Sequence, residues 1–95
     1  MAAFVMLGKY TGEGLRGMSS ARTEKAKELV KTCGGTMQTA FALLGEHDLL
    51  IIADFPSADK AAQASIALSK LTGIAFATSQ AIPVDDFDKL TASLP

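Results

Sequence analysis

The chain has 95 residues, of which 48% are hydrophobic, and its nine basic and ten acidic residues give a formal net charge of −1. This length fits one domain with a modest core, and the nearly balanced charge gives no electrostatic attraction toward nucleic acid or an anionic membrane. No apolar run reaches the ~20 residues needed to span a bilayer, and a single cysteine excludes an internal disulfide. We therefore expect a cytoplasmic protein with no nucleic-acid partner and no membrane partner.

The chain begins with a pattern that is typical of a β-strand. Residues 2–10 are mostly apolar and lack the cationic start of a signal peptide, so they predict a strand. Gly12 and Gly14 end it. Together with Gly17 these glycines match the G-x-G-x-x-G spacing of phosphate loops. Such loops belong to a parallel, doubly wound sheet for which this chain is too short, so phosphate binding is a weak hypothesis.

A first helix is predicted to follow over residues 20–32. Ser19-Ser20 offers an N-cap, and Glu24 lies in the first turn, where an acid favours the helix dipole. The apolar residues recur at the spacing i, i+3, i+4, i+7 and are Ala26, Leu29, Val30 and Cys33. We interpret Cys33 as a small buried residue and not as a nucleophile, because no histidine lies near it in the sequence.

The rest of the chain predicts further strands and helices, and together the elements form two β-α-β halves. These elements are strands at 36–44 and 47–55, a helix at 58–72, a strand at 74–84 and a short closing helix at 85–90. A two-residue hairpin at Gly45 and Glu46 is predicted to join the middle strands. The five phenylalanines, at positions 4, 41, 55, 76 and 87, are assigned to the core. The order βαββαβ predicts an α+β, ferredoxin-like sandwich: a four-stranded antiparallel sheet with two helices on one face.

The predicted strand at 47–55 is apolar on both faces. Its run from Leu49 to Ala53 is continuous, whereas a half-exposed strand alternates between apolar and polar residues. Two helices cover only one face of a small sheet, so the other face needs a partner. We expect that partner to be a second copy of the chain, packed sheet on sheet in an isologous homodimer.

Three stretches, at residues 4–11, 42–48 and 67–73, resemble the GYD domain family, and the likeness extends over about 4–90. The family is named for a Gly-x-Tyr-Asp turn. That turn stands here as Gly45-Glu46-His47-Asp48, with histidine at the position of the tyrosine. The family is grouped with dimeric α+β barrels, so the resemblance implies this fold and a dimer. It implies no particular reaction.

The polar residues that we consider as candidates for a ligand site are Tyr10, Arg22, His47 and Asp48. Tyr10 ends the first strand. It either packs in the core with its hydroxyl at the rim or lines a cavity and donates a hydrogen bond to a ligand. Arg22 lies in the first turn of the first helix, and it either binds an anionic group or is solvated.

His47 is the only histidine, and it is either an acid–base or binding group or an exposed turn residue. Neighbours in a strand point to opposite faces, so His47 and Asp48 are not expected to form a dyad. Asp48 is interpreted as an acceptor for backbone N–H groups in the turn. One histidine, one cysteine and scattered acids show no metal-ligand spacing, so no metal and no cofactor are expected.

These observations predict a homodimeric module that binds a small molecule, with no assigned reaction. Dimeric barrels of this kind can leave a pocket between the helices and the sheet. By analogy at the level of the fold, one alternative is an enzyme like the cofactor-independent monooxygenases. Another is a structural or regulatory dimerisation module, which the small number of catalytic groups in the sequence favours.

Overall fold

A four-stranded sheet is the framework of the protein in the computed structural model, which describes all 95 residues. The central strands are β1 (Ala2–Tyr10) and β3 (Leu49–Phe55), and the edge strands are β2 (Thr36–Ala42) and β4 (Ile74–Ala81). The strand order is β2-β3-β1-β4, and every neighbouring pair is antiparallel. This arrangement confirms the predicted α+β, ferredoxin-like sheet.

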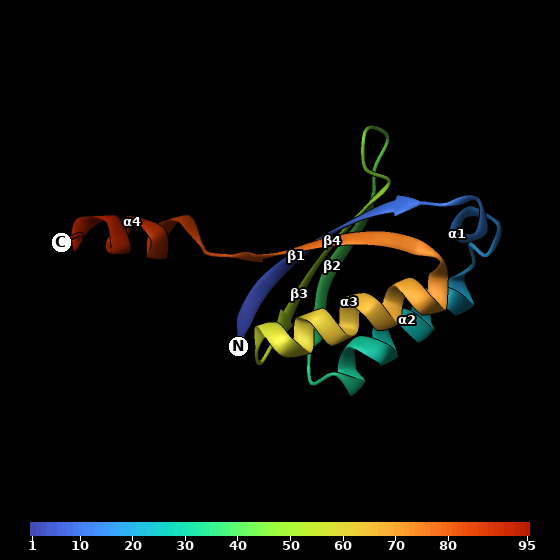
Figure 1. Ribbon diagram of the computed structural model, residues 1–95, viewed down its shortest axis with the longest axis horizontal. Coiled ribbons are helices and arrows are strands. Elements are labelled where there is room, and N and C mark those ends of the chain that lie inside the picture. Colours follow the sequence, from blue (N-terminus) through green and yellow to red (C-terminus); the bar gives the residue numbers. More distant parts are fainter.

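The two long helices lie on the same face of the sheet (Figure 1). These are α2 (Ser20–Thr32) and α3 (Ala58–Thr72). A short helix, α1 (Gly12–Arg16), follows β1, and α4 (Val84–Ala92) closes the chain. No helix is long and apolar enough to cross a membrane.

Local side-chain hydrogen bonds explain where the long helices begin. The Ser19 hydroxyl accepts from the N–H of Arg22 at 3.1 Å, and the Ser57 hydroxyl accepts from the N–H of Lys60 at 3.2 Å. Each serine thereby satisfies one of the N–H groups that a helix N-terminus leaves without an intrahelical partner. Gly73 ends α3 in the left-handed conformation at φ 74°, which glycine adopts at little steric cost.

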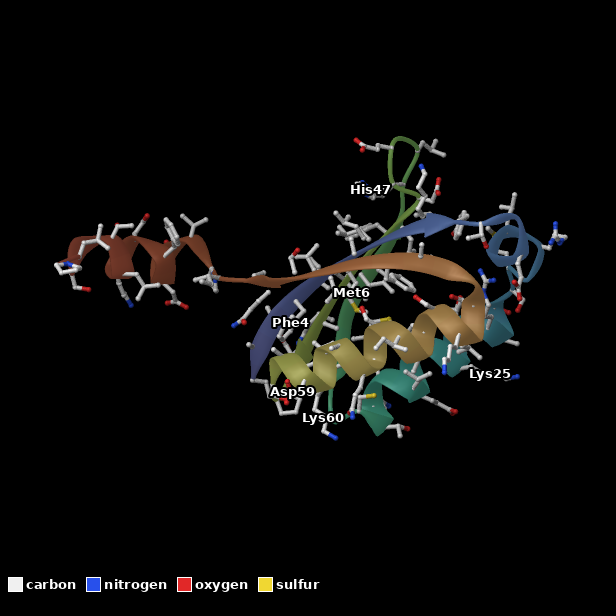
Figure 2. All side chains as sticks on the ribbon, viewed as in Figure 1. Phe4, Met6, Lys25, His47, Asp59 and Lys60 are labelled. Carbon is white, nitrogen blue, oxygen red and sulfur yellow. The ribbon has the colours of Figure 1, made fainter.

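The core lies between the sheet and the two long helices. Phe4 and Met6 point from β1 toward the helices (Figure 2), and the rings of Phe4 and Phe55 meet edge to face with their centroids 5.8 Å apart. The core residues are Phe4, Met6, Val30, Ile51, Ala53, Phe55, Ala61, Ala64 and Leu68. Cys33 is only partly buried and packs against the edge of this cluster.

Two of the five phenylalanines are not in the core, and the prediction was wrong for them. Phe41 is 55% exposed and Phe87 is 51% exposed. A β-bulge at Gln38 explains why Phe41 is exposed. Met37 pairs with Ala53 on the inner face, but after the bulge Phe41 pairs with Leu50 on the outer face. The extra residue reverses which positions of β2 face the helices.

The connection between β2 and β3 is longer than the predicted two-residue hairpin. The strands end at Ala42 and resume at Leu49, and the N–H of Leu43 closes the loop by donating to the carbonyl of Asp48 at 2.8 Å. The N–H of Asp48 itself donates to the carbonyl of Gly8 at 2.9 Å. Residues 43–48 therefore join the two strands, and the predicted strand bounds of 44 and 47 were too long.

The centre of the outer face of the sheet is apolar, and no helix covers it (Figure 1). On neighbouring strands Val5 lies opposite Ile52, and Leu7 lies opposite Leu50. The buried residues of β3, such as Ile51, alternate with these outward ones. β1 and β3 are therefore apolar on both faces, as the sequence predicted for β3.

The last helix, α4, stands away from the rest of the chain, at the end of an extended segment that continues β4 (Figure 1). None of its residues is buried, and the side chains of Val84, Phe87 and Leu90 are all exposed. Their spacing places them on one side of the helix. This apolar side has no contact partner within the chain.

A close approach of two glycines fixes α1 to the end of α3. A Cβ on Gly14 would lie 3.1 Å from the carbonyl oxygen of Gly73 and 3.2 Å from Cγ1 of Ile74. This close packing is a sufficient reason for a glycine at position 14, so no phosphate loop is needed to explain it. The packing also determines where α2 starts, since only a short segment separates α1 from α2.

We expect Gly73→Ala to lower the free energy of unfolding by about 1–2 kcal/mol, because an L side chain is disfavoured in the left-handed region. The new Cβ would also lie 3.1 Å from the backbone nitrogen of Gly14. Gly45→Ala is the matched control: it has an ordinary φ and no atom within 4 Å of the new Cβ. Urea unfolding at one protomer concentration compares them, and equal effects of the two substitutions would contradict the expectation.

Candidate functional site

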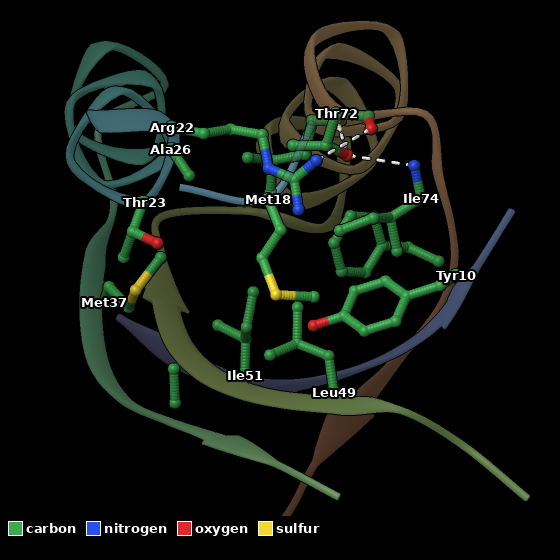
Figure 3. A pocket seen from close by; sticks show the side chains of 13 residues that line it. Tyr10, Met18, Arg22, Thr23, Ala26, Met37, Leu49, Ile51, Thr72 and Ile74 are labelled. Carbon is green, nitrogen blue, oxygen red and sulfur yellow. Dashed lines mark hydrogen bonds between the residues drawn. The ribbon is translucent and has the colours of Figure 1, made fainter. Parts of the chain in front are cut away.

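A cavity of about 110 Å³ lies between the sheet, the start of α2 and the end of α3 (Figure 3). Of its 13 lining residues, 10 are hydrophobic. The sheet and the segment before α2 supply most of the apolar wall, with Met18, Met37, Leu49, Ile51, Ile74 and Phe76. A mostly apolar hollow with a few polar groups is the usual form of a small-molecule site.

Arg22 contributes the only charged side chain of the cavity wall. Its Nη1 donates to the carbonyl of Gly14 at 2.6 Å and to the carbonyl of Thr72 at 3.4 Å. These bonds hold the side chain across the ends of α1 and α3. No carboxylate pairs with it, since the one ion pair of the chain joins Lys27 to Glu24 at the surface.

Tyr10 faces the same cavity from the end of β1, and its ring and hydroxyl point inward (Figure 3). The hydroxyl makes no hydrogen bond within the chain, so its donor and acceptor capacity is unused. Thr72 differs from it: its hydroxyl donates to the carbonyl of Leu68 at 2.7 Å and accepts from the N–H of Ile74 at 3.0 Å. Thr72 is therefore a structural residue that closes α3 onto β4.

Asp48 supports Tyr10 from outside the cavity. Its Oδ2 accepts a hydrogen bond from the backbone N–H of Tyr10 at 2.9 Å. That N–H group lies at the end of β1, next to the start of β3, where the hydrogen-bond ladder between the two strands stops. Without the Asp48 carboxylate it would have no acceptor. Asp48 thus holds the backbone that carries the phenol and does not itself line the cavity.

His47 lies apart from these residues. It belongs to the loop at 43–48, which projects from the sheet on the side away from the long helices (Figure 2). It is not among the residues that line the cavity. The structure therefore brings Tyr10 and Arg22 together at the cavity, places Asp48 behind Tyr10, and leaves His47, the neighbour of Asp48 in the chain, outside the cavity.

Met18 and Thr23 also line the cavity and were not among the predicted site residues. Thr23 carries no sequence signal for a site, because it lies among polar residues of its helix. Met18 did carry a signal, because it is an apolar residue in an otherwise polar segment between the glycine turn and the N-cap of α2. No group of His, Cys, Asp and Glu side chains in the structure could hold a metal ion.

Substitutions at Asp48 and His47 should separate their roles. We expect Asp48→Ala to lower the free energy of unfolding by about 1–3 kcal/mol, because it leaves the N–H of Tyr10 without an acceptor. Asp48→Asn keeps an oxygen acceptor and should cost less. His47→Ala should change stability by less than about 0.5 kcal/mol, as surface substitutions usually do. Denaturant unfolding checks this order, and a larger effect at His47 than at Asp48 would contradict it.

Comparison with protein families places the chain among known domains. The model of the GYD domain matches residues 4–91, which is nearly the whole chain. Searches of curated proteins and of solved structures found no significant match. The matched region includes all of the sheet except the first two residues of β1, together with the long helices and the cavity residues Tyr10 and Arg22. The chain belongs to the GYD domain family.

Proposed function

We propose that the protein is a homodimeric module that binds a small, largely apolar molecule in the cavity between its helices and sheet. The observation that carries this proposal is the cavity itself. It combines an apolar wall with two inward-facing polar groups, the guanidinium of Arg22 and the hydroxyl of Tyr10. In ligand sites, a few polar groups of this kind fix the orientation of a molecule whose affinity comes mainly from apolar contact.

The size of the cavity limits the ligand. Its volume is about 110 Å³, and an apolar cavity of about 150 Å³ is known to hold one benzene molecule. The cavity is smaller than this, so a single ring or a short chain is the largest ligand body to expect. Met18 is the adaptable part of the wall, because it is 52% exposed and its unbranched side chain has several rotatable bonds. Its movement would admit a somewhat larger molecule.

Binding is favoured over acid–base catalysis by the position of the histidine. His47 is the only histidine of the chain, and it lies outside the cavity. The polar groups at the cavity are suited to donating hydrogen bonds to a ligand. We therefore propose recognition of a small molecule and assign no reaction.

The dimer part of the proposal depends on the outer face of the sheet. Four strands of ~20 Å at a spacing of ~4.8 Å cover ~400 Å², which is as large as the apolar patches of typical soluble monomers. Pairing two such faces would bury ~800–1,600 Å² in total, within the range of specific interfaces. The apolar side of α4, with Phe87 and Leu90, is available to the same partner.

Filling the cavity should abolish binding of a small apolar probe. We expect toluene to bind the unaltered protein, and Ala26→Leu to weaken that binding by about tenfold or more, because overpacking a filled space costs about 1–3 kcal/mol. Ala26 lines the cavity from α2. Ala21→Leu is the matched control, since Ala21 is an exposed residue of the same helix. Ligand-observed NMR gives the affinities.

Two outcomes of this titration would contradict the binding proposal. One is that toluene fails to bind the unaltered protein at millimolar concentration. The other is that Ala26→Leu and Ala21→Leu bind it equally, because the probe would then occupy another place.

A charge at the centre of the outer face should dissociate the dimer. Leu50 lies between Leu7 and Phe41 on neighbouring strands, so Leu50→Lys would bury an unpaired cation in a sheet-on-sheet interface. We expect the dissociation constant to rise by about a hundredfold or more. Ile66→Lys, at an exposed position of α3, is the control. Sedimentation velocity reads the assembly, and a monomer of the unaltered protein at micromolar concentration would overturn the proposed dimer.

A further inference from the structure

We propose that the ligand of the cavity is a small carboxylic acid in its anionic form, with an apolar body against the sheet and its carboxylate on Arg22 and Tyr10. This inference rests on the proposed function, because it names the chemical class of the molecule that the cavity would bind. Three observations support it: the charge of the cavity wall, the donors that Arg22 leaves free, and the position of the Tyr10 hydroxyl.

The wall of the cavity has a positive charge and no negative one. Arg22 is partly buried, and none of the residues that line the cavity with it is acidic. Its protein partners are the neutral carbonyl groups of Gly14 and Thr72. Removing a charge from water is costly unless an opposite charge compensates it. A neutral ligand that closed the cavity would leave the guanidinium in this uncompensated state, whereas an anion would compensate it.

The hydrogen bonds of Arg22 leave part of its fork free. Both backbone contacts use Nη1, and Nε and Nη2 donate to no group of the chain. The contacts at the ends of α1 and α3 fix the plane of the guanidinium. Figure 3 shows it at one side of the cavity, above Met18. A guanidinium with its orientation fixed by other bonds is well suited to a carboxylate, because the two planar groups match in geometry.

The hydroxyl of Tyr10 supplies a further donor that points into the same cavity, below Met18 in the view of Figure 3. It makes no hydrogen bond within the chain, although the backbone beneath it is held by Asp48. One carboxylate oxygen can accept from it while the guanidinium binds the acid. A single cation in a mostly apolar wall favours a monoanion with an apolar body over a phosphate, whose charge and several oxygens need more donors.

Benzoate and benzamide are the probes that test this inference. They have the same shape and differ in charge at the group that would meet Arg22. We expect isothermal titration calorimetry on the unaltered protein to show benzoate binding about tenfold tighter or more, because charge-assisted hydrogen bonds are about twice as strong as neutral ones. This comparison uses no variant, so it does not depend on whether any substitution folds.

Substitutions then assign the preference to its residues. Arg22→Met keeps an unbranched apolar chain and should abolish the preference for benzoate while benzamide still binds. Lys25→Met is the matched control, because it removes a cation from the same helix at an exposed position that points away from the cavity (Figure 2). It should leave the preference intact. Tyr10→Phe should reduce the preference and retain apolar binding.

The outcomes distinguish this inference from the proposed function. If toluene and benzamide bind but benzoate has no advantage, the acid is overturned and the binding module stands. If the preference for benzoate survives in Arg22→Met, or disappears in Lys25→Met, the assignment to Arg22 is overturned. If none of the three probes binds the unaltered protein, both the proposed function and the acid fail.

Discussion

The requirement that β1 and β3 be covered on both faces organises this protein. The two central strands carry apolar side chains in both directions, so each face of the sheet must be removed from water. The long helices meet this requirement on the inner face and form the core with it. The outer face has no cover from its own chain, and the detached α4 leaves a second apolar surface beside it. The core and the proposed dimer surface are thus two sides of the same strands.

The cavity lies where the long helices do not pack completely against the inner face of the sheet. Near the ends of α1 and α3, the small residue Ala26 faces the sheet from α2, and the packing that is tight around Phe55 opens into a hollow. The polar groups at this place have structural support of their own. Arg22 is held by two helix-end carbonyls, and the backbone of Tyr10 is held by the carboxylate of Asp48. The groups that face the cavity are therefore positioned before any ligand enters, which lowers the entropy cost of binding.

Much of the fold could be predicted from the sequence, because its elements carry clear local signals. The first strand and the 58–72 helix have the predicted bounds, since glycine and serine punctuate them. The loop at 43–48 could not be predicted, because it depends on hydrogen bonds between Asp48 and a strand distant in the sequence. The orientation of Phe41 depends on a bulge at Gln38, which no alternation pattern indicates.

The candidate site was harder to predict from the sequence than the fold was. Tyr10 was a candidate because it is the sole tyrosine and ends the first strand, and Arg22 because it lies in the first turn of a helix; the structure places both at the cavity. His47 stood out for its chemistry alone, and it lies in a projecting loop. Met18 reaches the cavity from a connecting segment, whose path follows from the contact between Gly14 and Gly73. Such a contact between distant segments leaves no periodic signal.

The apolar character of both faces of β1 has a consequence for strand pairing. In most sheets a slip by one residue is prevented because it turns the apolar side chains to water. Here a slip would exchange Phe4 and Met6 for Val5 and Leu7, so hydrophobicity fixes the register less strongly and excluded volume must contribute. Gly8 has this role: a Cβ there would lie 3.0 Å from both Ile74 and Phe76, so no larger neighbour in β1 can take its place. In a slipped sheet Tyr10 would turn to the outer face. Whether Tyr10 lines the cavity thus depends on Gly8, whose side chain is a single hydrogen atom.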